Sequence, residues 1–450
     1  MKLATIHNVY FIGIGGIGMS ALARYFNFVG KNVAGYDKTR TELTDEMNQN
    51  GIDIHFEDDE TLIPQEYRDK ENTLVVYTPA VPATHTQLQY FKQHQFEIKK
   101  RAEVLGLLTK NTFSFAVAGT HGKTTTSAIL AYILHQTGTP ITAFLGGVSE
   151  DFESNFVMKG AQVTVAEADE FDRSFLHLSP DIACITSMDA DHLDIYGTAE
   201  ELQKTFKDFA GKLKPGGKLL VKNGLPIHGI TYGINDNADY SIKNLKIKNA
   251  AYVFDVVTPT EVITGVKFNK PGKHNLLNAL VALAMAAENG TPASRLAKAL
   301  ETFKGVKRRF SVHINTPELV YIDDYAHHPT EIEAVYQAIN EMYPGKKVTA
   351  IFQPHLFSRT KDFADAFAES LSKFNEVVLL EIYPAREKPI AGITSSWLLE
   401  KITSSKKSLK TKDELPHYIK SAQFDVLVTM GAGDIGQEVI RIKNRLEDAV

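Results

Sequence analysis

The chain has 450 residues, of which 43% are hydrophobic and 23% charged, and its formal net charge is -5 at pH 7. This length allows about two to four domains with cores of their own, and the slight negative charge argues against a nucleic-acid partner. The single cysteine, Cys184, excludes an intrachain disulfide, and no apolar run reaches the roughly 18 residues of a membrane span, so we expect a cytoplasmic protein without a membrane contact.

The first predicted elements are a short buried strand (NVYFIG), a glycine loop and a helix over residues 19–29. The loop has the pattern G-x-G-x-x-G, and a second strand (NVAGYD) ends in an aspartate about 20 residues later. Glycines let the backbone approach a diphosphate and the helix N-terminus faces its charge, so the spacing predicts a nucleotide- or diphosphate-binding loop. The alternative is that the glycines serve only the turn between strand and helix. The residues of the pattern are Gly13, Gly15, Gly18 and Asp37.

The rest of the first domain continues this alternation of strands and helices. A strand is predicted near residues 74–81 (LVVYTPAV), and EIKKRAEVLGLL closes the region near residue 108. Thr78, Pro79 and Ala80 lie just past the carboxyl end of the strand, where parallel sheets place ligand contacts. The apolar N-terminus loosely imitates a secretory signal peptide, but the regular strand, loop and helix in the same residues favour a folded domain.

A second glycine loop follows the strand FSFAVAG and opens the helix KTTTSAILAYIL. The loop GTHGKTT supplies backbone N–H groups, a lysine for the β- and γ-phosphates and a hydroxyl for Mg²⁺, so it predicts ATP binding. It is a shorter variant of the usual phosphate loop, which would have a glycine where this chain has Val117. The alternative is a merely glycine-rich turn. The predicted ATP-binding residues of the loop are Gly119, Thr120, His121, Gly122, Lys123, Thr124 and Thr125.

Two acidic clusters follow strands downstream of this loop, in VTVAEADEFD and in DIACITSMDADHLDIYG. Carboxylate oxygens suit Mg²⁺ and an imidazole can complete a second site, so Glu167 and His192 are the candidate metal ligands. Acids after strands are also common on solvated loops. Cys184 lies within the second apolar strand, and we expect it to pack in the core. Residues 218–270 are predicted to add antiparallel or edge strands to this domain.

The last third of the chain predicts a second doubly wound parallel sheet. Its strands are LVYIDDY, KVTAIFQPH, EVVLLEIYPA and FDVLVTMGAGD, which alternate with helices. His355, Arg359 and Arg386 follow strand ends, and a guanidinium suits capture of an amino-acid carboxylate, with a solvated loop arginine as the alternative. The predicted fold is therefore α/β with three domains, residues 1–108, 109–308 and 309–450, of which the central one carries the phosphate loop and a mostly parallel sheet.

The motifs together resemble one family. PGKHNLLNALVALAMA, joined to GTHGKTTT, EADE and DADHLD, is similar to the Mur ligases of peptidoglycan synthesis. GIGGIGMS, EADEFDRSFLHL, DDYAHHPTE, QPHLFSRT and YPAREKPIAG resemble the branch that joins L-alanine to UDP-N-acetylmuramate. One departure is Arg173, where many members of the family carry a smaller residue.

The resemblance implies a cytoplasmic ligase of cell-wall synthesis that uses ATP and Mg²⁺. ATP would phosphorylate the lactyl carboxylate of UDP-N-acetylmuramate, and the amine of L-alanine would attack the acyl phosphate. Lys123, His192, Arg309 and Glu167 would be catalytic, with Thr124 and Glu167 on one Mg²⁺ and His192 on a second. The implied ATP contacts beyond the loop are Asn275, Asn278, Arg309, Asp324 and His328. The implied UDP-sugar contacts are Gly13, Gly15, Gly16, Gly18, Met19, Ser20, Asp37, Thr78, Pro79 and Ala80, and the implied amino-acid contacts are Arg386, His355 and Arg359.

Four alternatives remain open at this point. A related ligase that recycles an intact tripeptide onto UDP-N-acetylmuramate would share both glycine loops. An NAD-dependent dehydrogenase explains the first loop but not the second, and a phosphate-loop kinase or ATPase explains the second but not the first. A nucleotide sensor without enzymatic activity would have no need of the clustered acids.

Overall fold

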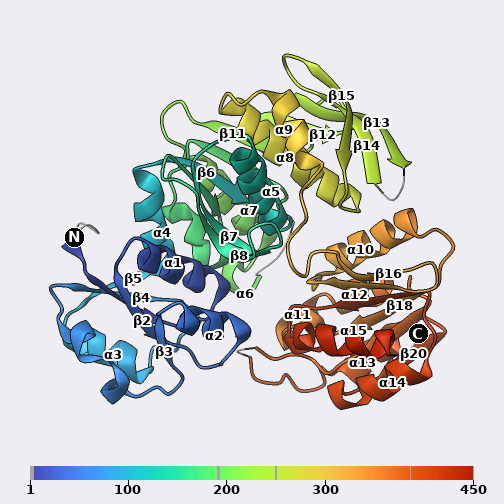
Figure 1. Cartoon of the computed structure of the whole chain (residues 1–450). Coiled ribbons are helices and arrows are strands. Elements are labelled where there is room, and N and C mark those ends of the chain that lie inside the picture. The colour runs from blue at the N-terminus through green and yellow to red at the C-terminus, as the bar shows by residue number, and fades with distance from the viewer. Residues whose placement is uncertain (1–4, 190–192, 249–250, 386, 449–450) are drawn as a thin grey trace. The chain divides into compact units, whose positions relative to one another are not determined.

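The computed structural model describes residues 5–189, 193–248, 251–385 and 387–448. In these residues the chain forms three β-sheets with helices packed on them (Figure 1), which confirms the predicted α/β architecture. The chain divides into two compact units: the N-terminal unit comprises residues 1–245, 254–267 and 278–304, and the C-terminal unit comprises residues 246–253, 268–277 and 305–450. The domain limits after residues 108 and 308 stay predictions.

The first sheet has five parallel strands in the order β3-β2-β1-β4-β5. The central strand β1 is buried at every position, as its apolar sequence predicts for a parallel sheet. Ile12 pairs with Tyr36 and with Tyr77, so the ends of β1, β2 and β4 lie at one edge of the sheet. The strands are β1 Asn8–Ile12, β2 Asn32–Tyr36, β3 Asp53–His55, β4 Thr73–Tyr77 and β5 Glu97–Lys100, and the helices are α1 Ile17–Phe28, α2 Glu42–Gln49, α3 Thr86–Gln93 and α4 Arg101–Lys110.

The second sheet has ten strands in the order β15-β14-β13-β12-β11-β10-β6-β9-β7-β8. The strands are β6 Phe113–Ala118, β7 Ile141–Ser149, β8 Ser154–Met158, β9 Val163–Glu167, β10 Ile182–Ile185, β11 Lys218–Lys222, β12 Ile230–Ile234, β13 Tyr240–Lys248, β14 Ala251–Val257 and β15 Val262–Phe268. The central strand β6 is parallel to both of its neighbours, β9 and β10. The segments that follow these three strands therefore lie at one edge. Strands β11 to β15 extend the sheet on one side, which confirms the edge alternative of the prediction. The pairs β11–β12 and β12–β13 are parallel and not antiparallel.

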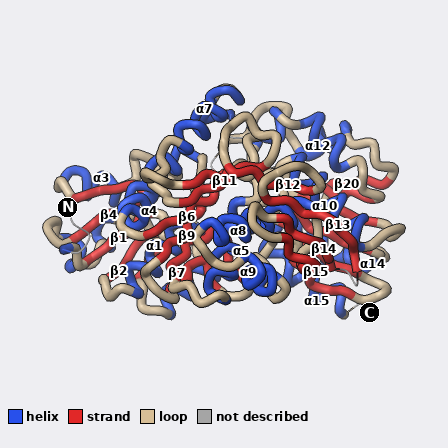
Figure 2. Tube along the Cα trace, turned by 90° about the horizontal axis from the view of Figure 1, so that it is seen from above, coloured by secondary structure: helices blue, strands red, loops and turns tan. Residues whose placement is uncertain are grey.

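The helices of this region are α5 Lys123–Gln136, α6 Leu193–Tyr196, α7 Ala199–Ala210, α8 Lys273–Glu288 and α9 Ala293–Leu300. Helix α5 is buried at every position from Thr124 to Leu134, because it contacts the sheet strands β7 and β9 on one side and α9 on another (Figure 2). Cys184 in β10 is fully buried, and burial raises the pKa of its thiol. The prediction that it packs in the core is confirmed.

The third sheet has six strands in the order β16-β17-β21-β18-β19-β20. The strands are β16 Ser311–Asn315, β17 Val320–Asp324, β18 Val348–Phe352, β19 Glu376–Leu379, β20 Lys406–Leu409 and β21 Val426–Met430, and the helices are α10 Pro329–Met342, α11 Phe357–Asp362, α12 Ala364–Leu371, α13 Ser395–Lys401, α14 Leu415–Ser421 and α15 Val439–Glu447. Only β16 is antiparallel to its neighbour among the strand pairs described in this sheet. The predicted doubly wound sheet is therefore present with one antiparallel edge strand.

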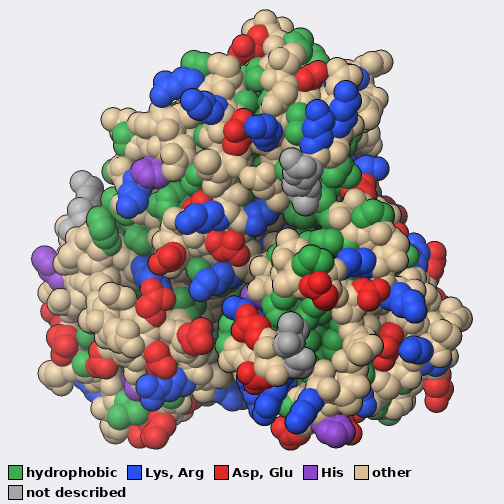
Figure 3. Space-filling view, turned by 45° about the vertical axis from the view of Figure 1, so that its right-hand side comes forward, with side chains coloured by type: hydrophobic (Ala, Val, Ile, Leu, Met, Phe, Trp, Pro, Cys, Tyr) green, Lys and Arg blue, Asp and Glu red, His purple; other side chains and the backbone are tan. Residues whose placement is uncertain are grey.

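Two surface properties complete the description of the fold. No helix among the described residues is both long and apolar enough to cross a bilayer. On the face drawn in Figure 3, Lys and Arg side chains are interspersed with Asp and Glu side chains. That face therefore presents no extended surface of a single charge.

Candidate active site

The first glycine loop joins β1 to α1 at the carboxyl edge of the first sheet. Gly13 has a φ of +86°, and a Cβ there would lie 2.7 Å from Thr78 Cγ2, so the turn against the β4 loop requires glycine. Gly13 N and Ile14 N both donate to the carbonyl of Tyr36, at 2.8 and 3.0 Å. The loop is thereby fixed to β2 and lies against the segment after β4.

In the described part of the chain, the N-terminus of α1 has neither a side-chain cap nor an acidic residue in its first turn. The residue at its N-cap is Gly16. The predicted acid, Asp37, accepts hydrogen bonds from Gly15 N at 2.7 Å and from Thr39 N at 3.0 Å. Its carboxylate therefore shapes the glycine loop. The first-turn N–H groups of α1 have no side-chain cap and are suited to an anionic ligand.

The second glycine loop joins β6 to α5, and two glycines with positive φ shape it. Gly119 has a φ of +133°, and a Cβ there would lie 2.0 Å from Thr186 Oγ1. Gly122 has a φ of +82° and caps α5, and a Cβ there would lie 2.5 Å from Asn278 Oδ1 of α8. Both positions therefore require glycine, and α8 contributes to the wall of this loop.

Residues after β10 fix the second loop from the neighbouring strand. The hydroxyl of Ser187 accepts a hydrogen bond from His121 N at 2.8 Å and lies 2.8 Å from the hydroxyl of Thr120. Asp189 N donates to Thr120 Oγ1 at 3.1 Å, and the Asp189 carboxylate lies 3.5 Å from His121 Nε2. His121 is thus held at the loop by its backbone and its ring.

Lys123 is the first residue of α5 and pairs with a buried carboxylate. Its Nζ lies 2.9 Å from Oε1 and 2.8 Å from Oε2 of Glu170, and it donates to the carbonyl of Gly119 at 2.7 Å. Glu170 is only 1% exposed. Burial alone would lower the pKa of Lys123, but nearby carboxylates, Glu170 first among them, more than offset this and raise the pKa. The Lys123 ammonium is therefore protonated and held at the loop by Glu170.

Glu167, at the end of β9, faces the start of the same helix. Its Oε1 accepts a hydrogen bond from the Thr124 hydroxyl at 3.2 Å, and its Oε2 accepts one from Gly146 N of β7 at 2.9 Å. A hydroxyl and a carboxylate side by side are hard oxygen donors that suit Mg²⁺. The described residues contain no group of three or more His, Cys, Asp or Glu side chains that could hold a metal. The predicted ligand His192 lies outside the described residues.

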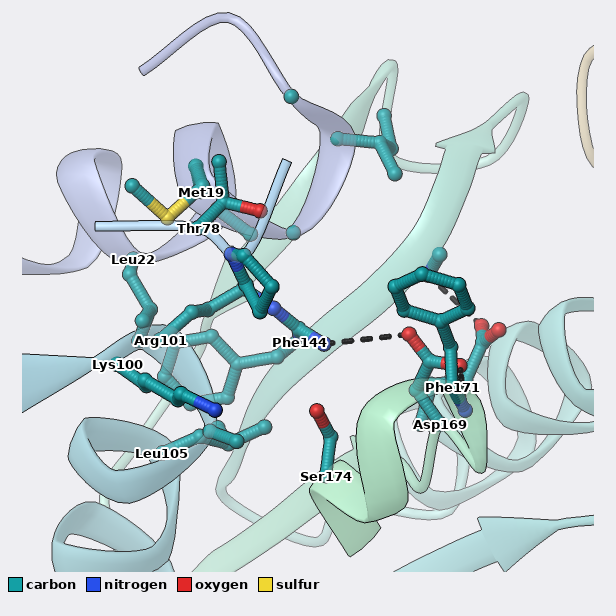
Figure 4. Close-up of a pocket in the computed structure, with 18 of the residues that line it drawn as sticks. Met19, Leu22, Thr78, Lys100, Arg101, Leu105, Phe144, Asp169, Phe171 and Ser174 are labelled. Carbon is teal, nitrogen blue, oxygen red and sulfur yellow. Dashed lines mark hydrogen bonds and ion pairs between the residues drawn. The ribbon is translucent and has the colours of Figure 1, made fainter. Parts of the chain in front are cut away.

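A cavity of about 250 Å³ connects the first glycine loop with Glu167 (Figure 4). Its walls are the first two turns of α1, the loop after β4, the start of α4, β7 and the segment after β9. Five of the predicted UDP-sugar contacts line it: Gly16, Gly18, Met19, Thr78 and Pro79. Glu167 thus lines the cavity and also accepts the hydrogen bond from Thr124 at the start of α5.

The other predicted UDP-sugar contacts do not line this cavity. Gly13, Gly15 and Asp37 form the turn described above. Ser20 is buried, donates to the Ile17 carbonyl at 2.9 Å and accepts from Asn155 Nδ2 at 2.9 Å. Ala80 is exposed in the loop after β4. Their assignment to a UDP-sugar stays a prediction.

Two ion pairs join the junction of β5 and α4 to the segment after β9. Arg101 lies 3.3 Å from the Asp169 carboxylate, and Lys100 lies 2.8 Å from that of Asp172. Asp172 and Arg173 both have left-handed backbones, with φ of 52° and 55°. Sequence reasoning missed the two cations, although a basic pair between a predicted strand and a helix was a usable signal. Arg173, the departure from the family pattern, places its guanidinium over the Tyr196 ring, 5.7 Å from the centroid.

The two predicted asparagines of α8 are both buried. Asn278 lies beside Gly122 in the N-terminal unit, as the Cβ clearance shows. Asn275 belongs to the C-terminal unit, where its Nδ2 donates to the Pro271 carbonyl at 2.6 Å. A nucleotide contact is a prediction for both residues, and the structure brings Asn278 to the second glycine loop.

In the C-terminal unit, Asp324 ends β17 and is buried. Its carboxylate accepts hydrogen bonds from Phe310 N and Ala326 N, both at 2.7 Å. Burial raises the pKa of Asp324 to about 6, although the charge of Arg309 and the two N–H groups oppose this. Arg309 lies over the ring of Tyr325, 5.0 Å from its centroid. Another predicted ATP contact of this unit, His328, caps α10 and is buried.

His355 and Arg359, predicted to bind the amino acid, lie together after β18. Arg359 NH1 is 3.4 Å from His355 Nδ1. The His355 ring stacks on Tyr383 with 5.8 Å between centroids and lies 6.1 Å from the ring of His327. Sequence reasoning missed His327 and Tyr383 as members of this cluster. The third predicted residue, Arg386, lies outside the described residues.

The chain belongs to the Mur ligase family, because family models match most of its length. The Mur ligase family catalytic domain matches residues 8–112, the Mur ligase middle domain residues 117–286, and the Mur ligase glutamate ligase domain residues 308–433. A family of ligases accounts for both glycine loops, which a dehydrogenase does not.

Full-length relatives give a finer comparison. The UDP-N-acetylmuramate–L-alanine ligase of Flavobacterium psychrophilum is 61% identical over 448 residues, which is 100% of each chain, and that of Christiangramia forsetii is 60% identical over 98% of each chain. The crystal structure of the UDP-N-acetylmuramate-alanine ligase of Thermotoga maritima matches with a TM-score of 0.82 and 29% identity over 98% of each chain. A murein peptide ligase of Psychrobacter arcticus shares the fold, with a TM-score of 0.70, 22% identity and coverage of 98% of this chain and 99% of that one.

Proposed function

We propose that this protein joins L-alanine to the lactyl carboxylate of UDP-N-acetylmuramate, with ATP and Mg²⁺, in peptidoglycan precursor synthesis. The observation that carries the proposal is the cavity from the first glycine loop to Glu167, which itself contacts the start of α5. A diphosphate-type site and a phosphate-type loop thereby meet at one carboxylate. That arrangement suits transfer of a phosphoryl group from one ligand to the other. The proposed location of the reaction is the cytoplasm, where both nucleotides are available.

The residues around Glu167 account for the first chemical step. A carboxylate becomes a good electrophile once phosphorylated, but its own charge repels the γ-phosphate of ATP. Lys123 carries a positive charge at the start of α5 and would offset that repulsion. Thr124 and Glu167 would hold Mg²⁺, which supplies further positive charge between the two anions. Glu170 keeps the lysine charged and in place until phosphate binds.

The second step needs an amino acid with a free amine. His355 and Arg359 form a compact cluster with Tyr383, and with Arg386 they are the proposed contacts of the alanine carboxylate. The choice of L-alanine over a tripeptide rests on the relatives, since proteins named as L-alanine ligases are 59–61% identical over 98–100% of the chain. The murein peptide ligase, at 22% identity, shares only the fold.

The experiment is a measurement of phosphate release from ATP and Mg²⁺ with UDP-N-acetylmuramate and one amine at a time. L-alanine, glycine, L-serine and the tripeptide are offered separately, and product mass is confirmed. Release that requires both UDP-N-acetylmuramate and L-alanine is expected. Release with the tripeptide alone would assign the protein to the recycling branch, and no release with any amine would reject the proposal.

A further inference from the structure

We propose that Arg101 binds the diphosphate of the UDP-sugar and that Asp169 holds its guanidinium in position. The inference deepens the proposed function and rests on it. Arg101 is the first residue of α4 and lines the cavity between the first glycine loop and Glu167. Figure 4 shows its side chain reaching through the cavity toward Asp169.

The guanidinium lies directly against the first turn of α1. A Cβ on Gly18 would be 2.8 Å from Arg101 NH1 and 3.2 Å from its Cζ. The third glycine of the G-x-G-x-x-G pattern therefore leaves room for this cation as well as for a close backbone approach. Helix N–H groups without a side-chain cap and a guanidinium converge at one place, and both are donors suited to phosphate oxygens.

The hydrogen-bond inventory of Arg101 also points to a ligand. The side chain is only 20% exposed, and its one ion-pair partner among the described residues is Asp169, at 3.3 Å from NH2. A guanidinium has five N–H donors in a fixed plane. One donor is used by Asp169, and the Arg101 side chain lines the cavity. Asp169 therefore sets the orientation of the Arg101 guanidinium and leaves further N–H donors for a diphosphate.

Lys100, the neighbouring cation, is arranged differently. Its ammonium pairs with Asp172 at 2.8 Å, and that hydrogen bond raises the pKa of Lys100. Its side chain is 39% exposed, twice the exposure of Arg101. A point charge engaged by one carboxylate does not offer the bidentate donor pair of a guanidinium. Of the two cations, Arg101 is the one whose geometry matches a diphosphate.

The test is a calorimetric titration of the full-length protein with UDP and, separately, with UDP-N-acetylmuramate, both without added metal. UDP has the diphosphate but lacks the lactyl carboxylate, so it separates the two anionic groups that Arg101 could contact. Arg101→Gln is expected to weaken both ligands by about 10- to 100-fold, because charge-assisted hydrogen bonds are lost. Arg101→Lys is expected to restore only part of that loss. Thermal unfolding of each variant confirms that it folds.

Lys99→Gln is the matched control, because it removes one positive charge from β5 at a lysine that pairs with Glu97 and does not line the cavity. It is expected to bind UDP within about twofold of the unaltered protein, since an ion pair between partly exposed side chains contributes little. The double variant Arg101→Gln with Asp169→Asn is expected to bind like Arg101→Gln alone, because Asp169 acts through the guanidinium.

Four outcomes would overturn the inference. Equal, small losses in Arg101→Gln and Lys99→Gln would reduce the role of Arg101 to general charge. Loss confined to UDP-N-acetylmuramate, with UDP unaffected, would assign the guanidinium to the lactyl carboxylate. Failure of the unaltered protein to bind UDP would remove the proposed function, and the inference with it, whereas normal UDP binding by Arg101→Gln would remove the inference alone.

Discussion

Gly146 offers a sharp test of the site, because its lack of a side chain makes room for Glu167. A Cβ at this position would lie 2.1 Å from Oε2 and 2.5 Å from the carboxyl carbon of Glu167. Gly146→Ala therefore forces the carboxylate away from Gly146 N, its hydrogen-bond donor at 2.9 Å, and with it from the Thr124 hydroxyl. The backbone is no obstacle, because Gly146 is not among the glycines with positive φ.

The expected cost is of two kinds. Overpacking lowers the free energy of unfolding by about 1–3 kcal/mol. The larger effect is on Mg²⁺, because Thr124 and Glu167 are the proposed ligands and one charge-assisted hydrogen bond that orients the carboxylate, of about 1.5–3 kcal/mol, is lost. Since each 1.36 kcal/mol is about tenfold, the Mg²⁺ concentration for half-maximal phosphate release should rise by about 10- to 100-fold.

The assay is phosphate release with UDP-N-acetylmuramate, ATP and L-alanine across a range of Mg²⁺ concentrations. Gly211→Ala is the matched control: Gly211 ends α7 in a right-handed conformation, and its nearest neighbour to an added Cβ is the Asp208 carbonyl at 3.3 Å. This variant should keep the Mg²⁺ requirement of the unaltered protein. An unchanged Mg²⁺ requirement in a folded Gly146→Ala protein would refute the placement of the metal at Glu167.

Three further predictions follow from buried groups. Glu170→Leu should lower the free energy of unfolding by about 3–5 kcal/mol, because it leaves the buried ammonium of Lys123 without its carboxylate partner. Adding Lys123→Met should recover part of that loss. A double variant that is no more stable to urea than Glu170→Leu would contradict this. Burial raises the pKa of Asp324 from 3.8 to about 6, so between these pH values the folded protein holds a proton that the unfolded chain has lost. The free energy of unfolding should therefore fall by up to about 3 kcal/mol as the pH rises from 4 to 6. Urea titrations at both pH values should show a smaller fall for Asp324→Asn. The Cys184 thiol is fully buried and should react with a thiol reagent only after unfolding, whereas fast labelling of the folded protein would contradict its burial.

The sequence was sufficient for the fold class and for the two glycine loops, because buried parallel strands and loop glycines leave local patterns. Gly119 and Gly122 have positive φ, and that requirement is readable in the residue type alone. Partners from distant segments were not readable. The pairing of Lys123 with Glu170 depends on β9 lying beside β6, and the approach of Arg101 to Gly18 depends on how α4 follows β5. Strand order and side-chain direction decide such contacts.

Asp37 shows a different limit of sequence reasoning. An acid about 20 residues after a glycine loop predicts a contact with the ligand. In the structure its carboxylate accepts the N–H of Gly15 at 2.7 Å and so shapes the loop itself. The spacing places the acid beside the loop, but it does not reveal that the carboxylate also supports the backbone. The contact of Asp37 with a ligand stays a prediction.

The contacts of α1 bear on whether residues 1–108 could fold or be exchanged as a separate piece. Tyr25 on this helix packs against Phe144 of β7 and Phe156 of β8, with ring centroids 5.6 and 6.1 Å apart, and Ser20 is hydrogen-bonded to the buried Asn155. One core cluster accordingly includes buried residues of both the first and the second sheet, among them Val9 and Val221. A fragment that ends near residue 108 would expose this aromatic surface to water and tend to aggregate. Exchange of residues 1–108 between relatives would therefore have to include β7 and β8 as well.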